Sequence, residues 1–190
     1  MQRLQICIGA AKGLDYLRDG VGPQHRILHR DIKSANILLN DHWEAKVSGF
    51  GLSMIGPSIL QHTFLVTNAC GTFGYLDPVY YKSGVLTKES DVYSFGVLLF
   101  EILCGRLACA EESEDGNKFL GPLAERKYEE DKLDEIIDPD LRKQMKLNSL
   151  NTFSTIAYHC LKSNRSERPT MAQVVEKLEN AFSLQVSFRW

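Results

Sequence analysis

Hydrophobic residues recur at three- and four-residue intervals in four stretches of the chain, and this period predicts four amphipathic helices. The positions that carry the pattern are Leu4, Ile8, Ala11, Leu14 and Leu17 in the first stretch, Leu120, Leu123, Ala124 and Tyr128 in the second, Phe153, Ile156, Ala157, Cys160 and Leu161 in the third, and Met171, Val175, Leu178 and Phe182 in the last. Thr170 and Gln173 form a capping box, which predicts where the last helix begins.

A fifth stretch, residues 91–104, is apolar on nearly every side. A helix without a polar face must be buried all round, so this helix is predicted to run through the centre of the domain. Ser90 is its predicted N-cap and Gly105 its predicted stop.

Two short apolar runs on either side of Asn40-Asp41 predict a small β-hairpin over 37–48. The next stretch, residues 49–86, is broken by glycines and prolines and shows no sustained period. It is too long for a plain connection, and such loops are usually functional. We therefore predict one mainly α-helical domain with a small β-hairpin and a long irregular segment.

The composition is typical of a soluble globular protein, because 44% of the 190 residues are hydrophobic and 24% are charged. The net charge of −2 argues against a general nucleic-acid-binding protein. The charge is uneven, since residues 111–140 hold twelve acidic and four basic side chains. A solvated acidic surface explains this excess, and a docking surface for a basic partner is the alternative.

The five cysteines include no Cys-x-x-Cys pair, which predicts free thiols in a reducing compartment. The longest apolar stretch is far shorter than the roughly 20 residues that a membrane-spanning helix needs, and the N-terminal residues make a poor secretion signal. We expect a cytoplasmic protein without a membrane segment, or one on the cytoplasmic side of the plasma membrane if it is part of a longer receptor.

One motif carries candidate chemistry. Residues 29–36 read His-Arg-Asp-Ile-Lys-Ser-Ala-Asn and place a carboxylate, an ammonium and an amide on one short loop. Asp31 can accept a hydroxyl proton, Lys33 can neutralise charge that develops on a phosphate, and the Asn36 amide oxygen can hold Mg²⁺. For each residue taken singly, a solvated turn is the alternative.

The motif resembles the catalytic loop of the protein kinase family, H-R-D-x-x-x-x-N. Further family landmarks follow in order: Gly49-Phe50-Gly51 in place of D-F-G, Gly71-Thr72-Phe73-Gly74-Tyr75, Asp77-Pro78-Val79 in place of A-P-E, Asp91-Val92-Tyr93-Ser94-Phe95-Gly96, and Arg168-Pro169. Residues 32–39 and 71–78 are most similar to plant receptor-like serine/threonine kinases. The resemblance implies the C-terminal lobe of the kinase-like α+β fold over 1–190, with the N-terminal lobe absent and an activation-segment-like loop over 49–80.

The resemblance also implies roles and cofactors. Asp31 is the expected catalytic base, Lys33 a phosphate contact and Asn36 a magnesium ligand. Lys33, Asn36 and Leu38 are the expected ATP-binding positions, with Leu38 under the adenine ring. The implied cofactors are ATP and Mg²⁺.

Other matching positions are expected to support the loop or to regulate it. These are His29 and Phe50, which would stack in the interior, Asp91, which would tie the loop backbone to the central helix, Thr72, which would line the substrate hydroxyl site, and Arg30, which would meet a phosphate on Thr63 or Thr67.

Two departures from the family pattern predict weak activity. Gly49 stands where the family has its metal-holding aspartate, and Asn36 alone is a poor site for a hard cation. Val79 stands where the family has a glutamate that pairs with Arg168, and the loss of one partner from a buried ion pair costs about 3–5 kcal/mol unless Arg168 finds another acceptor, which is the alternative. We accordingly expect Val79→Glu to stabilise the domain and Gly49→Asp to leave its stability almost unchanged.

Three functions compete on this basis. They are a serine/threonine kinase that transfers the ATP γ-phosphoryl group to protein hydroxyls, a non-catalytic kinase-like binding module, and a truncated gene product. We expect a kinase-like domain with impaired catalysis and with protein substrates or partners. The face near Leu38 and Phe50, which an N-terminal lobe would cover, is expected to be exposed and to allow self-association.

Overall fold

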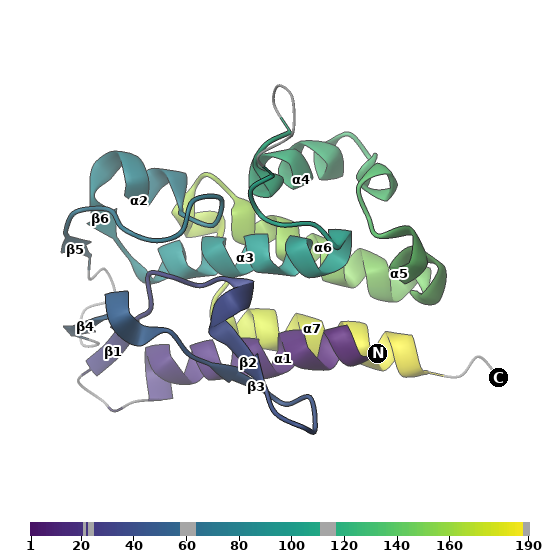
Figure 1. The fold of residues 1–190 in the computed structure, drawn as a ribbon, viewed down its shortest axis with the longest axis horizontal. Helices are drawn as coiled ribbons and strands as arrows, with labels where there is room; N and C mark the ends of the chain where they lie inside the picture. The colour runs from purple at the N-terminus through teal and green to yellow at the C-terminus, as the bar shows by residue number, and fades with distance from the viewer. Residues whose placement is uncertain (21, 23–24, 58–63, 111–116, 188–190) are drawn as a thin grey trace.

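The computed structural model describes residues 1–20, 22, 25–57, 64–110 and 117–187. Its α-helices are α1 (Gln2–Asp15), α2 (Pro78–Ser83), α3 (Lys88–Cys104), α4 (Leu120–Glu129), α5 (Pro139–Gln144), α6 (Leu147–Leu161) and α7 (Met171–Val186). Shorter helical turns are the π-helical turn Tyr16–Gly20 and the 3-10 turns Ser34–Asn36, Phe50–Leu52, Leu133–Glu135 and Arg165–Glu167. Figure 1 shows α1 and α7 side by side, with α3 and α6 above them and α4 at the top edge.

The strands form three two-stranded antiparallel sheets: β1 (His25–Leu28) with β4 (Met54–Pro57), β2 (Ile37–Leu39) with β3 (Ala45–Val47), and β5 (Leu65–Val66) with β6 (Val85–Leu86). The β2–β3 pair is the predicted hairpin. The prediction that 49–86 lacks regular structure is wrong in part, because β4, β5, β6 and α2 lie within it. These elements are too short for a period to show, and the pairing of β4 with β1 joins distant parts of the chain.

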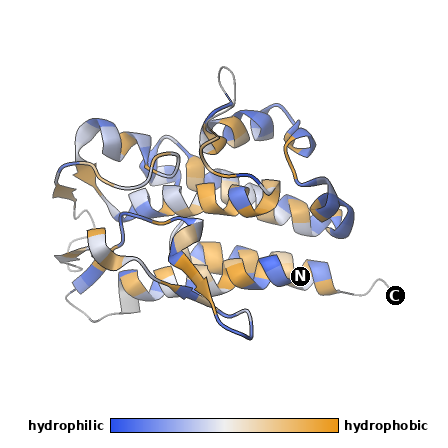
Figure 2. Ribbon diagram, viewed as in Figure 1, coloured by the Kyte–Doolittle hydropathy of each residue, from blue (hydrophilic) through white to orange (hydrophobic). Residues whose placement is uncertain are grey.

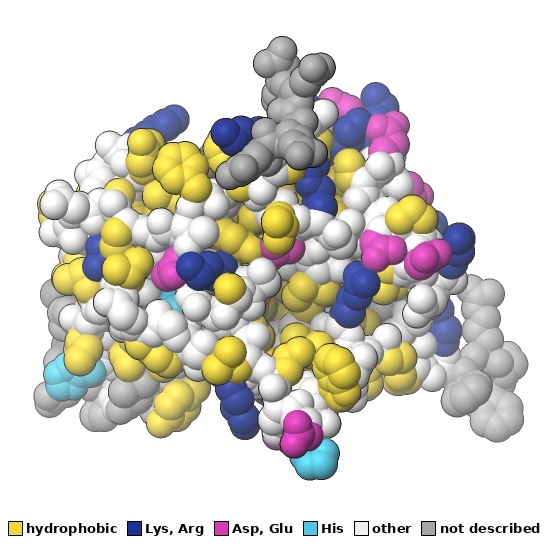
Figure 3. Space-filling view, viewed as in Figure 1, with side chains coloured by type: hydrophobic (Ala, Val, Ile, Leu, Met, Phe, Trp, Pro, Cys, Tyr) yellow, Lys and Arg dark blue, Asp and Glu magenta, His cyan; other side chains and the backbone are white. Residues whose placement is uncertain are grey.

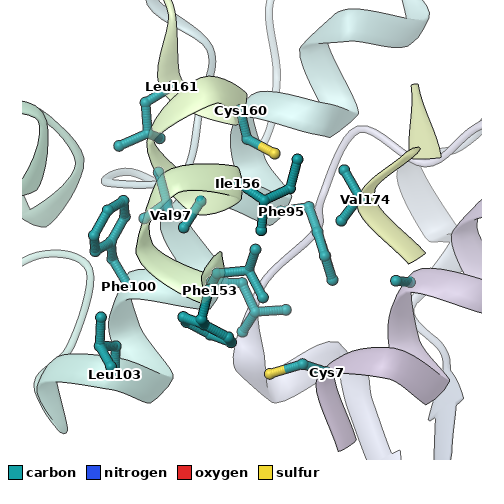
Figure 4. Packing of buried hydrophobic residues seen from close by; sticks show 14 of the residues in the cluster. Cys7, Phe95, Val97, Phe100, Leu103, Phe153, Ile156, Cys160, Leu161 and Val174 are labelled. Atoms are coloured by element: carbon teal, nitrogen blue, oxygen red, sulfur yellow. The ribbon is translucent and has the colours of Figure 1, made fainter. Parts of the chain in front are cut away.

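The core is built around α3, as its apolar sequence predicts. Leu98 and Leu99 on this helix expose only 2% and 0% of their surface. Figure 4 shows Phe95 of α3 close to Ile156 of α6 and Val174 of α7, all of them buried. Burial of side chains of this size stabilises the fold by roughly 1.5–3 kcal/mol each.

The predicted beginning of α3 is wrong by one turn. Thr87 is the N-cap residue, the helix begins at Lys88, and the Ser90 hydroxyl accepts a hydrogen bond from the Thr87 backbone N–H at 3.3 Å. A serine can stand at the N-cap or at the third helical position of a capping box, so the sequence alone did not decide which of these positions Ser90 occupies. The stop is confirmed, because Gly105 adopts φ 64°, where glycine is favoured.

The predicted core face of α7 is wrong in part. Val174 and Ala181 are fully buried, whereas Val175 and Phe182 are only partly buried. Both α1 and α6 pack against α7, so its buried stripe is centred between these two neighbours rather than on one of them. Met171 and Leu178 lie on the stripe, as predicted.

Hydropathy follows this arrangement. Figure 2 shows hydrophobic residues concentrated in α1, α3 and α6 and hydrophilic residues in α5 and at the tip of the β2–β3 hairpin. All five cysteines are free, as predicted. Among the described residues, no helix is long and apolar enough to cross a membrane.

Candidate active site

The loop between β1 and β2 carries the predicted motif, and the first turns of α3 hold it in place. The Asp91 carboxylate accepts hydrogen bonds from the backbone N–H groups of His29 at 2.7 Å and of Arg30 at 2.8 Å. Arg30 adopts φ 70°, a left-handed conformation that costs energy in a residue other than glycine. Asp91 and the loop backbone are therefore in direct contact, and this contact sustains the unusual turn.

His29 joins this loop to the end of β3. Its ring lies 5.1 Å from the ring of Phe50, measured between centroids. His29 Nε2 lies 2.8 Å from the Ser48 carbonyl oxygen, and Nδ1 accepts from the Asp31 backbone N–H at 3.3 Å. These two contacts assign the ring proton to Nε2, so a neutral histidine satisfies both neighbours.

Asp31, Lys33 and Thr72 form a closed polar cluster. Lys33 Nζ lies 2.9 Å from Asp31 Oδ2 and donates to Thr72 Oγ1 at 2.8 Å, and Thr72 Oγ1 donates to Asp31 Oδ1 at 2.6 Å. Burial raises the pKa of Asp31, but the hydrogen bonds from Thr72 and Lys33 outweigh it, and the net pKa lies below the ordinary value. Asp31 is therefore ionised at neutral pH, and a hydroxyl group brought here meets a carboxylate beside an ammonium.

Asn36 fills the space on the other side of Asp31. Its Nδ2 donates to the Asp31 backbone oxygen at 2.7 Å and to Asp31 Oδ2 at 3.2 Å. Gly49 approaches so closely that a Cβ atom on it would lie 2.4 Å from Asn36 Cγ and 2.4 Å from Oδ1. Gly49 also has φ 82°, so both the backbone and the neighbouring amide favour glycine at this position.

Arg30 turns its side chain toward the segment that follows β4. Of the two threonines predicted to carry a phosphate, Thr67 places its Oγ1 3.4 Å from Arg30 Nη2. Thr63 lies outside the described residues.

A sequence model of the protein kinase domain matches residues 4–178. The chain belongs to the protein kinase family. It is similar to three receptor-like protein kinases of Arabidopsis thaliana: FERONIA, 47% identical over 98% of this chain, and ANXUR1 and HERK 1, each 45% identical over 97% of it. The chain spans about a fifth of the length of these relatives, which is 20%, 21% and 22% respectively. The resemblance to plant receptor-like kinases is thereby confirmed.

The kinase family uses Mg²⁺, but the residues of this site do not fit the ion. Asn36 presents its amide nitrogen to Asp31 rather than its oxygen, and both Asp31 oxygens already accept hydrogen bonds. Among the described residues, no three His, Cys, Asp or Glu side chains gather as metal ligands do. A hard cation needs several oxygen ligands, and Gly49 supplies no side-chain oxygen.

The expectation that Gly49→Asp leaves the stability of the kinase lobe unchanged is wrong, because any Cβ atom at this position overlaps Asn36. We predict that Gly49→Ala lowers the free energy of unfolding by about 1–3 kcal/mol, through the left-handed backbone and the overlap. Denaturant unfolding is the measurement. Gly51→Ala is the matched control, since a Cβ on Gly51 meets nothing within 4 Å. Equal free energies of unfolding for Gly49→Ala and Gly51→Ala would contradict the prediction that the overlap with Asn36 is destabilising.

The expectation that Val79 leaves Arg168 without a partner is also wrong. Arg168 Nη2 lies 3.0 Å from Asp77 Oδ1, and Arg165 Nη2 lies 2.8 Å from Asp77 Oδ2. Arg168 also donates to two backbone carbonyl oxygens, those of Lys162 at 2.7 Å and of Glu89 at 2.9 Å. The structure thus removes the reason to expect that Val79→Glu stabilises the kinase lobe.

Asp77 stands in a family landmark named above, but its role as the ion-pair partner of Arg168 was missed in the sequence analysis. Its side chain is 0% exposed, and it caps α2 by accepting from the Val79 backbone N–H at 3.1 Å. Burial raises its pKa, but the hydrogen bonds and charges of Arg168 and Arg165 outweigh burial and lower the pKa below the ordinary value. The one sequence signal was Asp77-Pro78, which is typical of a helix start.

An apolar cavity beside Thr72 was also missed. It has a volume of about 230 Å³ and is lined by Phe73, Gly74, Leu76, Pro78, Tyr81, Tyr93, Phe119 and Pro122. Its walls come from the segment before α2, from α2 and α3, and from the beginning of α4. No local sequence pattern indicated this cavity, because α4 begins more than 35 residues after α2 ends.

The predicted lobe-interface face is exposed. Leu38 is 55% exposed and Phe50 43%, and Leu52 and Ile55 lie nearby in the sequence with 40% and 69% of their surface exposed. Figure 3 shows hydrophobic side chains over the lower part of this view, around the β2–β3 hairpin. The position predicted to support adenine, Leu38, is therefore open on the surface of this chain.

Proposed function

We propose that this chain is a receptor-like serine/threonine kinase lobe that keeps the protein-binding side of the active site and is impaired in phosphoryl transfer. The observation that carries the proposal is that Gly49, at the position of the family's metal-holding aspartate, supplies no carboxylate, and the Asn36 side chain lies where a Cβ atom on residue 49 would be. Kinase catalysis consists of positioning and of charge stabilisation around the phosphates. Without that carboxylate, the main anchor of the metal ion is lost.

The protein-binding side supports recognition of a peptide segment. The Asp31 carboxylate and the Lys33 ammonium would meet a serine or threonine hydroxyl, and the apolar cavity lined by Phe73, Tyr81 and Phe119 would seat a neighbouring apolar side chain. Two of these aromatic residues, Phe73 and Phe119, pack at 6.2 Å between ring centroids. Burial of one aliphatic side chain in such a cavity contributes roughly 1.5–3 kcal/mol.

The decisive test is nucleotide binding. We expect isothermal calorimetry to detect no Mg²⁺-dependent binding of ATP at millimolar nucleotide, and a radiolabel assay to detect no transfer to a serine-containing protein. Asp31→Asn is the control for any residual signal, because it removes the expected base. A Mg²⁺-dependent affinity in the micromolar range would overturn the proposal and would favour an active kinase.

An active serine/threonine kinase is the second candidate, and one observation favours it. Asp31, Lys33 and Thr72 form the polar cluster that the family's substrate hydroxyl site requires. ATP and Mg²⁺ belong to this candidate as cofactors. A non-catalytic binding module differs from it in the calorimetric result and in the radiolabel assay, whereas both would bind a protein segment.

The proposed binding partners and cellular location follow from the family. A protein substrate or partner and a place on the cytoplasmic side of the plasma membrane are proposed from the receptor-like relatives. The exposed face around Leu38 and Phe50 is proposed as a contact with a partner or with a second copy of the chain.

A further inference from the structure

The side chain of Arg30 joins the catalytic loop to the segment 64–80 through hydrogen bonds. Nη1 donates to the Leu52 carbonyl oxygen at 3.1 Å. Nη2 donates to the Tyr80 hydroxyl at 2.8 Å and to the Asn68 carbonyl oxygen at 3.0 Å. Nη2 carries two hydrogens, so its contact with Thr67 Oγ1 at 3.4 Å is a third and weakest one.

Every one of these acceptors is electrically neutral. They are two backbone carbonyl oxygens and two hydroxyl groups, and among the described residues no carboxylate oxygen lies within 4.0 Å of the Arg30 guanidinium. Hydrogen bonds from a charged donor are worth more than those between neutral groups, about 1.5–3 kcal/mol each. The contacts between Arg30 and the segment therefore involve a charged donor and neutral acceptors.

Tyr80 completes the arrangement. It is 1% exposed, and its ring belongs to a small cluster with Leu28 and Leu86. Its hydroxyl accepts from Arg30 and donates to the Asn68 carbonyl oxygen at 3.0 Å. Arg30, Tyr80 and Asn68 thus close a triangle in which each pair shares a hydrogen bond.

The triangle lies next to the polar cluster at Asp31, because Arg30 and Asp31 are consecutive residues. The backbone N–H of Arg30 is held by Asp91, and the next residue, Asp31, contacts Thr72 in the same segment. One side chain and one peptide unit therefore separate the Tyr80 hydroxyl from Asp31.

We propose that Arg30, Tyr80 and the Asn68 carbonyl form a latch that holds the segment 64–80 against the catalytic loop without a phosphate on the chain. The latch makes the order of this segment a property of the unmodified protein. It goes beyond the proposed function and does not depend on it, because it concerns the segment and holds whether or not phosphoryl transfer occurs.

The test is hydrogen exchange of the segment in protein whose intact mass shows that it carries no phosphate. Tyr80→Phe removes one oxygen atom and keeps the buried ring. It removes both hydrogen bonds of the hydroxyl, and we expect amide exchange within 64–80 to become at least about tenfold faster, the effect of the lost bond to the charged Arg30 alone. Tyr81→Phe is the matched control, since the neighbouring Tyr81 is 59% exposed and has no part in the triangle. Its exchange should equal that of the wild type.

Three results would overturn the latch. The first is equal exchange in Tyr80→Phe and Tyr81→Phe. The second is an unprotected segment in unmodified wild-type protein, which needs no variant and so remains decisive if Tyr80→Phe fails to fold. The third is a Thr67→Glu variant whose segment exchanges at least tenfold more slowly than that of the wild type, because the segment would then depend on an anion at Arg30.

Discussion

Asp77→Asn lowers the free energy of unfolding by about 3–5 kcal/mol, since it removes the carboxylate charge that the buried guanidinium of Arg168 contacts. The substitution keeps the size of the side chain and the oxygen that caps α2, so the loss reports the charge rather than the cap. Arg165, which is 16% exposed and contacts the other Asp77 oxygen, loses its charged partner as well and keeps its hydrogen bonds to Val85 O and Ser90 Oγ. Urea or guanidinium unfolding at neutral pH measures the change.

The chain offers a matched control in Asp138→Asn. Asp138 also precedes a proline, also caps a helix, α5, and also contacts an arginine, Arg3, at 3.2 Å. Arg3 is 48% exposed, so water replaces the lost charge and the expected loss of stability is much smaller than that of Asp77→Asn. A similar loss in both variants would assign the effect of Asp77 to helix capping instead of the buried ion pair.

The same pair predicts acid sensitivity. The folded-state pKa of Asp77 lies below its ordinary value of about 3.9, because Arg168 and Arg165 outweigh the effect of burial. Its contribution to stability is therefore complete above that ordinary pKa and is lost as the pH falls through the folded-state pKa. The stability difference between wild type and Asp77→Asn should stay constant above pH 5 and narrow below pH 4, as unfolding titrations can measure.

Asp91→Ala has the second large expected effect, a loss of about 2–5 kcal/mol. Two backbone N–H groups, those of His29 and Arg30, lose their acceptor inside the fold, and each unsatisfied buried donor costs about 1–3 kcal/mol. The left-handed turn at Arg30 loses its support at the same time. Denaturant unfolding measures the stability, and hydrogen exchange of residues 29–36 should become faster.

Glu89→Ala is the control that distinguishes the loss of these hydrogen bonds from the loss of a negative charge at the beginning of α3. Glu89 and Asp91 are the two acidic residues in the first turn of α3, and each interacts favourably with the helix dipole by about 0.3–1 kcal/mol. Glu89→Ala should lose only that amount and should leave the exchange of residues 29–36 unchanged. If Glu89→Ala lowered the free energy of unfolding as much as Asp91→Ala does, the two hydrogen bonds to the loop backbone would not explain the effect of Asp91→Ala.

The sequence by itself determined four amphipathic helices, α1, α4, α6 and α7, the central buried helix α3 and the catalytic-loop motif, but not the short helices α2 and α5. Periodicity in α1, α4 and α6, the capping box at Thr170 and the glycine at position 105 are local signals, because the interactions that they report lie within about one helical turn. The order of motifs from His29 to Arg168 was likewise enough to identify the kinase family.

Only the tertiary structure decided which partner each polar group has. Arg168 pairs with Asp77, a residue 91 positions away, and no pattern in a single sequence specifies that distance. The space beside Gly49 depends on how the end of β3 lies against Asn36, and the neutral latch of Arg30 depends on where α2 brings Tyr80. Such contacts depend on packing between elements. Packing places the Asp77 carboxylate beside Arg168, where the family's glutamate is missing at Val79, and it places the Asn36 side chain beside Gly49.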